Sequence, residues 1–371
     1  MEKKYPVGVN DFAKIREEGF LYIDKTAAVY DLANNNYSPL LCRPRGFGKS
    51  LLISTLECYF QGRKELFEGL EIELLEKEWK HYPVIRINMG EVKTAKITEM
   101  KEQIGNQLQK YEEIYEIKKI YSLLSIRLTH IIETAYTATG LHPVVLIDDY
   151  DTPALYAAGD EDKAEEVMTC IESFLTPLKG EYLKFLFITG ITRYPESTLR
   201  SGLNLSHKTL SPKYSAICGI TEDEMLQEFS DGIQEIADAN GWTKDECVTE
   251  LRNNYGGYHF SHNSPEIYNP YSLLRALESK KIGQYWASTT PKYIIETIKE
   301  FGKDICSIGE IPSSEYWLYN QYVDSSTIPL LFQSGYFSIK SSREDIYGDT
   351  FIIDIPNKEV GDNLKEIMKL I

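Results

Sequence analysis

The chain has few of the residues from which disulfide frameworks and metal sites are built. Its 371 residues include six cysteines and six histidines. No two cysteines form a C-x-x-C pair, and none stands at a spacing typical of metal ligands. The pair His259-x-x-His262 lies in a stretch rich in Gly, Ser and Asn, with no third ligand beside it. We therefore expect reduced, mostly buried thiols, as in cytoplasmic proteins, and no zinc site.

Long apolar segments are also missing. The sequence contains no run of eighteen apolar residues, which is about the length that a membrane-spanning helix needs. The first residues, Met-Glu-Lys-Lys-Tyr-Pro-Val-Gly, do not contain the apolar core of a secretory signal peptide. From these two observations we expect a cytoplasmic protein that does not associate with a membrane.

Positive charge is in deficit. Forty Lys and Arg residues stand against 56 Asp and Glu residues, which gives a formal net charge of -16. This balance opposes non-specific binding of the whole chain to nucleic acid, but it does not exclude a local basic patch. Hydrophobic residues make up 42% of the chain, enough for packed cores, and the length predicts two or three domains.

A glycine-rich loop between an apolar run and an amphipathic helix is the most informative feature that is present. The apolar run ends at Cys42, the loop contains Gly46 and Gly48, and apolar residues recur at helical spacing from Lys49 onwards. Such a loop leaves backbone N–H groups unpaired at the positive end of a helix, where a polyphosphate binds. The Lys49 ammonium would reach the outer phosphates, and the Ser50 hydroxyl would bind Mg²⁺.

The match to the common phosphate-loop pattern G-x-x-x-x-G-K-[ST] is incomplete. Arg43 stands where the pattern has its first glycine. On the tripeptide Gly-Lys-Ser alone, an ordinary surface loop at the start of a helix explains the sequence equally well.

A second element, at residues 143–151, favours the phosphate site. Its Val-Val-Leu-Ile run is typical of a strand buried on both faces of a parallel sheet, and carboxylates follow directly. Ligands bind beyond the carboxyl ends of such strands. Asp148 would therefore hold Mg²⁺, and Asp149 would stand beside the attacking water as the candidate base. The alternative is a strand that ends in an acidic loop, with Asp151 capping the next helix.

Together these residues resemble the AAA-ATPase-like proteins of bacteria and archaea, over nearly the whole chain. The resemblance is carried by Arg-Pro-Arg-Gly-Phe-Gly-Lys-Ser at 43–50, Leu-Ile-Asp-Asp-Tyr-Asp at 146–151, Thr-Gly-Ile-Thr at 189–192 and Tyr-Gly-Gly-Tyr at 255–258. In that family Arg is usual at the position of Arg43, so this residue no longer counts against nucleotide binding. Two departures remain, because Gly46 stands where Arg is common and Asp149 where Glu is common.

The resemblance implies an α/β fold: a P-loop NTPase with a five-stranded, mostly parallel sheet, followed by a helical lid and a winged-helix-like C-terminal module. We expect the ATPase core with its N-terminal lead-in at 1–220, the lid at 221–305 and the module at 306–371. The residue pattern predicts strands ending at residue 42 and at 84–88, 143–148, 183–191 and 215–219, and helical structure over 97–136.

The C-terminal residues predict helices followed by a β-hairpin. Residues 316–332 are expected to be partly helical, and residues 336–340 and 350–355 alternate as two strands. This order is typical of a winged helix, which can bind DNA. Arg343 stands among acidic residues, so we expect the module to pack against the core instead. Many longer family members continue into a nuclease-like domain, for which this chain contains no metal-dependent constellation.

The resemblance also implies the ligands, ATP and Mg²⁺, and the residues that bind them. Thr189 would sense the γ-phosphate or merely satisfy a strand end, and Arg193 would reach a γ-phosphate or pair with a surface carboxylate. The predicted site consists of Arg43, Arg45, Gly46, Phe47, Gly48, Lys49, Ser50 and Leu51 for the nucleotide, Ser50 and Asp148 for the metal, and Asp149, Lys49, Thr189 and Arg193 for catalysis.

Two functions follow from this site. The first is slow Mg²⁺-dependent ATP hydrolysis by a nucleotide-driven switch. The N-terminal lead-in would either be a structural approach to the sheet or, by analogy with the family, cover the adenine. The alternative is a non-hydrolysing, nucleotide-dependent scaffold or regulator that binds DNA or protein through the winged helix. A protein partner, a homo-oligomer and GTP in place of ATP stay open, although no guanine-reading N-K-x-D motif occurs.

Overall fold

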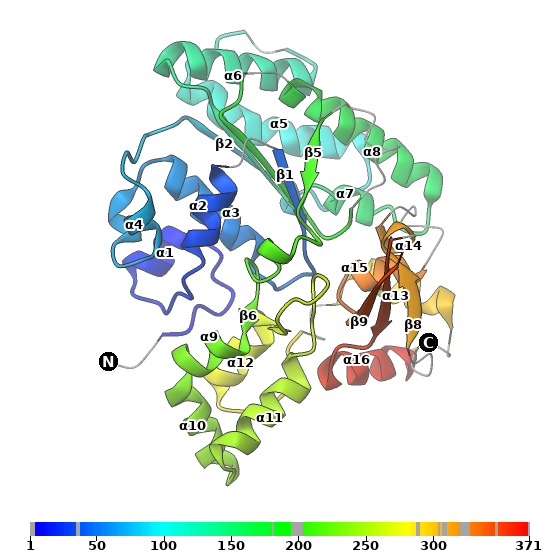
Figure 1. Cartoon of the computed structure of the whole chain (residues 1–371). Helices are drawn as coiled ribbons and strands as arrows, with labels where there is room; N and C mark the ends of the chain where they lie inside the picture. The colour runs from blue at the N-terminus through cyan, green and yellow to red at the C-terminus, as the bar shows by residue number, and fades with distance from the viewer. Residues whose placement is uncertain are drawn as a thin grey trace.

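A five-stranded parallel sheet forms the centre of the computed structural model (Figure 1). The structure describes residues 4–34, 38–119, 121–179, 182–193, 203–286, 290–302, 305, 310–319, 327–345 and 348–369. The sheet has the order β2-β3-β4-β1-β5, and all neighbouring strands are parallel, which confirms the predicted sheet. Its strands are β1 (Ser38–Cys42), β2 (Val84–Asn88), β3 (Val144–Asp148), β4 (Phe185–Gly190) and β5 (Leu205–His207).

Helices cover both faces of the sheet (Figure 1). Successive strand residues point to opposite faces, so Leu146 packs in the core under α3, whereas Val145 and Ile147 pack under α5, α6 and α8. The α3 side carries α1 (Phe12–Glu17), α2 (Thr26–Ala33), α3 (Lys49–Phe60) and α4 (Ile72–Leu75). The other side carries α5 (Ile97–Ile114), α6 (Leu124–Thr139) and α8 (Glu161–Leu175), and the short α7 (Thr152–Leu155) follows β3.

Two predicted elements differ in the structure. The fifth strand is Leu205–His207, not residues 215–219. The latter segment follows a 3-10 turn at Pro212–Tyr214 and ends at Gly219, whose φ of +99° is incompatible with a strand. The helical stretch over 97–136 is two helices, because Glu116 has a left-handed φ of +53° after α5 ends.

Residues 220–279, called the lid below after the lid expected at 221–305, form a helical unit with a hydrophobic core of its own. It consists of β6 (Ile220–Thr221), α9 (Glu222–Glu228), α10 (Ser230–Asn240), α11 (Lys244–Tyr255), β7 (Ile267–Tyr268) and α12 (Pro270–Ser279). Thr221 and Glu224 form a capping box at the start of α9. Met225, Ile233 and Leu251 pack in the separate core.

The C-terminal residues share their core with the central sheet. Leu331 and Phe351 belong to the same cluster as Leu56 of α3. The predicted hairpin is present as β9 and β10, and β8 pairs with β10 at its other edge. The winged helix remains a prediction, and residues 320–326 of the expected helical segment lie outside the described residues. The elements are α13 (Lys292–Phe301), β8 (Ile311–Ser314), α14 (Glu315–Tyr319), α15 (Thr327–Gln333), β9 (Ser338–Asp345), β10 (Gly348–Asp354) and α16 (Lys358–Lys369).

Candidate nucleotide site

The glycine-rich loop joins β1 to α3 in a conformation that depends on two glycines. Gly46 has φ +85°, and Gly48, the N-cap of α3, has φ +94°. A side chain is strained at both φ values. A Cβ at Gly46 would also lie 3.3 Å from Tyr271 Cβ and 3.4 Å from Asn269 Oδ1. The close approach of α12 therefore explains why this chain has glycine where the family commonly has arginine.

Lys49 lies buried at the start of α3 and contacts both the loop and β3. Its Nζ donates hydrogen bonds to the carbonyls of Arg43 at 3.1 Å and Pro44 at 3.4 Å, and lies 3.2 Å from Asp149 Oδ1. Burial disfavours the ammonium, but Asp149, Asp148 and Asp151 outweigh it and raise the pKa of Lys49. The charged ammonium is therefore the favoured form of Lys49 at neutral pH.

Asp148 ends β3 and is held by polar groups on either side. The Thr189 hydroxyl, at the end of β4, donates to Asp148 Oδ1 at 2.9 Å and accepts from the Asp149 N–H at 3.2 Å. Burial and then the charge of Asp149 raise the pKa of Asp148, against the opposing effect of hydrogen bonds from Ser50 and Thr189. The site thus brings Ser50, Asp148, Asp149 and Thr189 together as the sequence predicted.

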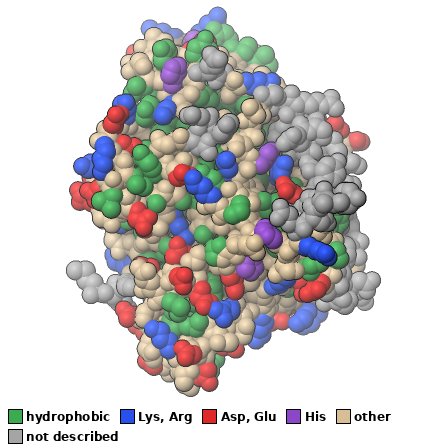
Figure 2. Space-filling model, viewed as in Figure 1, with side chains coloured by type: hydrophobic (Ala, Val, Ile, Leu, Met, Phe, Trp, Pro, Cys, Tyr) green, Lys and Arg blue, Asp and Glu red, His purple; other side chains and the backbone are tan. Residues whose placement is uncertain are grey.

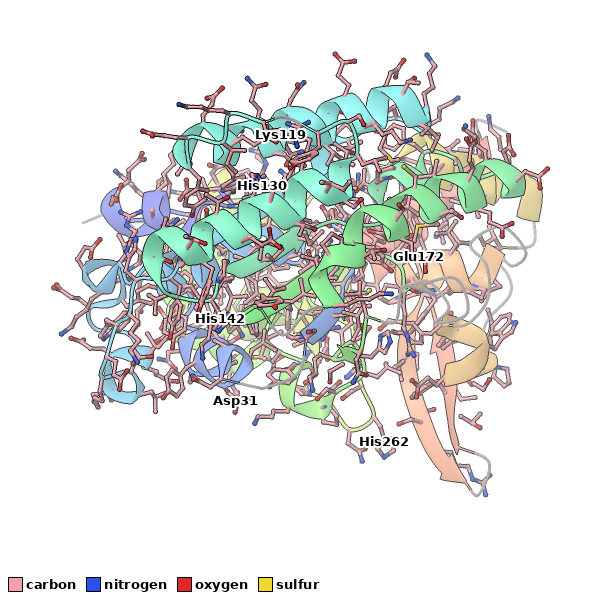
Figure 3. All side chains as sticks on the ribbon, turned by 90° about the horizontal axis from the view of Figure 1, so that it is seen from above. Asp31, Lys119, His130, His142, Glu172 and His262 are labelled. Carbon is pink, nitrogen blue, oxygen red and sulfur yellow. The ribbon has the colours of Figure 1, made fainter. Side chains whose placement is uncertain are left out.

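The oxygen ligands present fit a magnesium ion. Asp148 Oδ2 is buried without a hydrogen-bond partner among the described residues, and its nearest cation is Arg86 Nη2 at 3.6 Å. Together with the Ser50 hydroxyl, this carboxylate offers the hard oxygen donors that Mg²⁺ prefers. Within the described ranges, no group of three or more His, Cys, Asp or Glu side chains is placed to hold a metal. Figure 3 shows His130 and His142 far from His262.

Asp149 adopts a backbone conformation that is uncommon for a residue with a side chain. Its φ is +48°, a region that aspartate tolerates better than most residues. Gly90 makes room for it, since a Cβ there would lie 3.2 Å from Asp149 Oδ2. The carboxylate therefore sits between Lys49 and the turn after β2.

Two of the three arginines predicted for the site, Arg43 and Arg193, form contacts within the fold. Arg43 is buried, and its Nη1 and Nη2 donate to the carbonyls of Cys42 and Thr209, both at 2.8 Å, and of Tyr214 at 3.1 Å. Arg193 Nη1 lies 3.4 Å from Glu315 Oε1, and the Arg193 N–H donates to Gln333 at 2.6 Å. Of the alternatives for Arg193, the structure contains the carboxylate pair.

A largely apolar hollow with a volume of about 100 Å³ adjoins the loop. Phe47 and Leu51, two of the predicted nucleotide-binding residues, line it beside Gly48. Tyr22 and Ile23 of the N-terminal lead-in line another side, and Phe229 and Leu274 line it from the lid. An apolar lining is typical of small-molecule pockets, but the usual volume of such pockets, about 300–1,000 Å³, is larger than that of this hollow. Sequence periodicity does not reveal this hollow, because its walls come from three distant segments.

Asp151 has a role that the sequence did not predict. It precedes α7 but makes no side-chain cap there. Instead, its buried carboxylate accepts hydrogen bonds from the Ile191 N–H, the Thr192 N–H and the Thr192 hydroxyl, at 2.5 to 3.1 Å. It thereby fixes the end of β4 against the end of β3. The run of carboxylates after β3 was the available signal, but its partners are forty residues away in sequence.

On the face drawn in Figure 2, the described residues form no continuous basic patch. Figure 2 shows acidic and basic side chains interspersed, with acidic ones gathered over the lid at the bottom of the view. Glu222, Asp223 and Glu224 form the first turn of α9 in this region. Each described helix is too short or too polar to cross a lipid bilayer.

Comparison with known proteins identifies the family of this chain. A family model described as Predicted AAA-ATPase matches residues 6–199. The chain belongs to the Predicted AAA-ATPase family. This membership supports a nucleotide-binding, ATPase-type function, for which the loop at 43–50 is the predicted P-loop.

Two individual proteins are similar to this AAA-ATPase chain. An "Uncharacterized protein in vnfD 5'region" from Azotobacter chroococcum mcd 1 is 29% identical over 374 residues, which cover 99% of this chain and 70% of the relative. The solved structure of the Aeropyrum pernix ORC2 protein, in ADPNP and ADP complexes, is 11% identical with a TM-score of 0.33, over 93% of this chain and 94% of the other. Because this TM-score is low, the fold is assigned from the strand order of the central sheet and not from this likeness.

Asp151 gives this AAA-ATPase chain a testable pH dependence of stability. Burial raises the pKa of Asp151 to about 6, despite the opposing donors of Thr192. The unfolded value is about 3.9, so the folded protein binds more protons between these values and its stability falls as the pH rises through them. We expect the free energy of unfolding of the wild type, relative to Asp151→Asn, to fall by about 1 kcal/mol from pH 5 to pH 7. Urea unfolding at both pH values measures this, and a pH-independent difference would contradict it.

Proposed function

We propose that this protein binds ATP with Mg²⁺ and hydrolyses it slowly, so that the bound nucleotide acts as a switch. One observation carries the proposal: the Lys49 ammonium, on the P-loop, lies 3.2 Å from the carboxylate of Asp149, which directly follows Asp148 at the end of β3. This juxtaposition is the minimum that phosphoryl transfer to water requires.

The P-loop would bind the phosphates. Its backbone N–H groups at Gly46, Phe47 and Gly48 face no helical partner, since they precede or cap the first turn of α3. On binding, the Lys49 ammonium would exchange its contacts with the loop carbonyls for the outer phosphates. This exchange costs little free energy, because the loop carbonyls and the phosphates are all strongly polar or charged hydrogen-bond acceptors.

Ser50 and Asp148 would hold the metal, and bound Mg²⁺ would neutralise charge on the phosphates. The Thr189 hydroxyl fixes the orientation of the Asp148 carboxylate. Through its second hydrogen bond, to the Asp149 N–H, the same hydroxyl links the metal ligand to the candidate base. Thr189 would thus respond to the γ-phosphate as the family resemblance implies.

The apolar hollow beside Phe47 would take the nucleobase. Its lining by Tyr22 and Ile23 supports the earlier expectation that the N-terminal lead-in covers the adenine. Lid residues Phe229 and Leu274 close it from the other side, so base binding would bring the lid and the core together. In this arrangement, residues 1–220, 221–305 and 306–371 act as core, lid and C-terminal module of a cytoplasmic protein.

A first prediction concerns binding. Lys49→Ala removes the cation that the P-loop directs at the outer phosphates, so ATP should bind at least tenfold more weakly, a loss of about 1.4 kcal/mol. Calorimetric titration of the wild type and the variant measures this. Lys96→Ala, which removes an exposed lysine at the start of α5, is the matched control and should bind as the wild type does. An unchanged dissociation constant for Lys49→Ala would remove the P-loop assignment.

A second prediction concerns the departure at Asp149. Aspartate is one methylene shorter than the usual glutamate, so its carboxylate falls short of a water held for attack, and a positioned base is worth about 10² to 10⁴ in rate. We expect Asp149→Glu to speed hydrolysis and Asp149→Asn to slow it. Single-turnover rates at saturating ATP and Mg²⁺ separate this effect from binding. A slower Asp149→Glu variant would show that Asp149 is not the base.

A non-hydrolysing scaffold is the second candidate, favoured by the engagement of Asp149 with Lys49 in an uncommon backbone conformation. Such a protein would bind nucleotide and act through its C-terminal module on DNA or on a protein partner, including a second copy of the chain. Phosphate release with and without nucleic acid discriminates between the two functions.

A third prediction concerns nucleic acid. Because the net charge is -16, random-sequence duplex DNA should bind more weakly than about micromolar at physiological salt. Fluorescence anisotropy with a labelled duplex measures this. Submicromolar affinity that falls steeply with added salt would instead favour the DNA-binding alternative.

A further inference from the structure

Trp286 connects the P-loop to the C-terminal part of the chain. It is 2% exposed, and its indole Nε1–H donates to the Arg45 carbonyl at 3.1 Å. The Arg45 guanidinium lies 5.9 Å from the centre of its ring, and the Tyr336 ring centre lies 5.0 Å away on the C-terminal module. A Cβ at Gly46 would lie 3.7 Å from Trp286 Cδ1. Trp286 therefore contacts the outer side of the P-loop through both a hydrogen bond and its ring.

Glu359 holds Trp286 in this position. It lies in the first turn of α16 and is 2% exposed. Its Oε1 accepts hydrogen bonds from the Tyr285 N–H at 2.6 Å and the Trp286 N–H at 2.8 Å. A buried carboxylate is costly unless such donors satisfy it. Its contacts with the backbone at 285–286 therefore fix the segment that carries the indole.

The hydrogen bond to Arg45 determines the direction of an N–H group in the phosphate site. The Arg45 carbonyl and the Gly46 N–H belong to one peptide plane, and no described peptide bond is cis. In a trans peptide these two groups point in opposite directions. Because the carbonyl points at Trp286, the Gly46 N–H points away from it. Gly46 tolerates either orientation of this peptide better than other residues do, so the loop alone does not fix it.

We propose that Trp286, held by Glu359, is a positioning residue for nucleotide: it orients the 45–46 peptide for phosphate binding and couples the P-loop to helix α16. This inference rests on the proposed ATP binding. Because coupling is reciprocal, nucleotide that changes the 45–46 peptide also changes how firmly α16 is held. The route requires no contact between the ligand and the C-terminal module.

Removal of the indole donor tests the positioning role. Trp286→Phe keeps an aromatic ring but loses the Nε1–H, so the dissociation constant for ATP should rise about three- to tenfold, the range expected for one hydrogen bond. Glu359→Ala should produce a similar rise, whereas Glu359→Gln, which retains a carbonyl acceptor, should stay within about twofold of the wild type. The control Trp242→Phe, in the lid, should have no effect.

The same titrations separate positioning from a purely structural role. If Trp286 only stabilises the fold, Trp286→Phe lowers the melting temperature without nucleotide but leaves the dissociation constant of the folded protein unchanged, and that result would overturn the proposal. If Glu359→Ala does not fold, Trp286→Phe decides. A wild type that does not bind ATP overturns the proposed function as well, whereas normal wild-type binding with an unaffected Trp286→Phe overturns only this inference.

Fluorescence tests the coupling directly. In a variant with Trp79, Trp242 and Trp317 changed to Phe, emission comes from Trp286 alone. We expect ATP to shift the wavelength or intensity of this emission, and Glu359→Ala in the same background to reduce the shift. Emission that is unchanged at saturating ATP, in a variant shown by calorimetry to bind it, would show that the P-loop and Trp286 are not coupled.

Discussion

The charge balance between Lys49 and the carboxylates after β3 is the constraint on which this site depends. A buried ammonium is costly without partners, and so is a buried carboxylate. Here Lys49 compensates Asp149 at 3.2 Å while two loop carbonyls accept its remaining hydrogens. The Lys49 side chain is 6% exposed and that of Asp149 is 24% exposed, so removing Asp149 would leave a buried charge without its compensating partner. The P-loop and the end of β3 therefore hold each other in place before any nucleotide is bound.

Parallel strand order extends this arrangement to β4. Because β4 lies between β1 and β3, Thr189 at its end comes between the P-loop and the acidic residues. Its hydroxyl donates to Asp148 and accepts from the Asp149 backbone, and Asp151 in turn accepts from the backbone after β4. The side chains of Asp148, Thr189 and Asp151 thus hold the ends of β3 and β4 together. A ligand that moves the Asp148 carboxylate would also move Thr189 at the end of β4. Arg193 follows β4 and contacts Gln333 and Glu315 on the C-terminal module, so the movement would be passed on to that module.

The parts of this arrangement that are local in sequence were predictable from it. Gly48, Lys49 and Ser50 follow one apolar run, and Asp148 follows another, so pattern alone placed them at strand ends. The fifth strand was misplaced because residues 215–219 have strand-like composition, but Gly219 has φ +99°. The role of Asp151 and the use of Arg43 to bind three backbone carbonyls depend on partners far along the chain. No periodicity in a single sequence encodes such contacts.

The position of Gly46 indicates that the nucleotide site is not complete in the first half of the chain. The family model ends at residue 199, yet the outer side of the P-loop is contacted by Asn269, Tyr271 and Trp286. These neighbours leave little space for a side chain at Gly46, and a glycine in turn gives the loop a flexibility that an arginine would not. The glycine and its neighbours therefore depend on each other. A loop made flexible by Gly46 needs support from Asn269, Tyr271 and Trp286, and these residues pack well only against a glycine. A fragment that ends at residue 199 would keep Lys49 and Asp148. It would lose Asn269, Tyr271 and Trp286, which support the loop before Lys49.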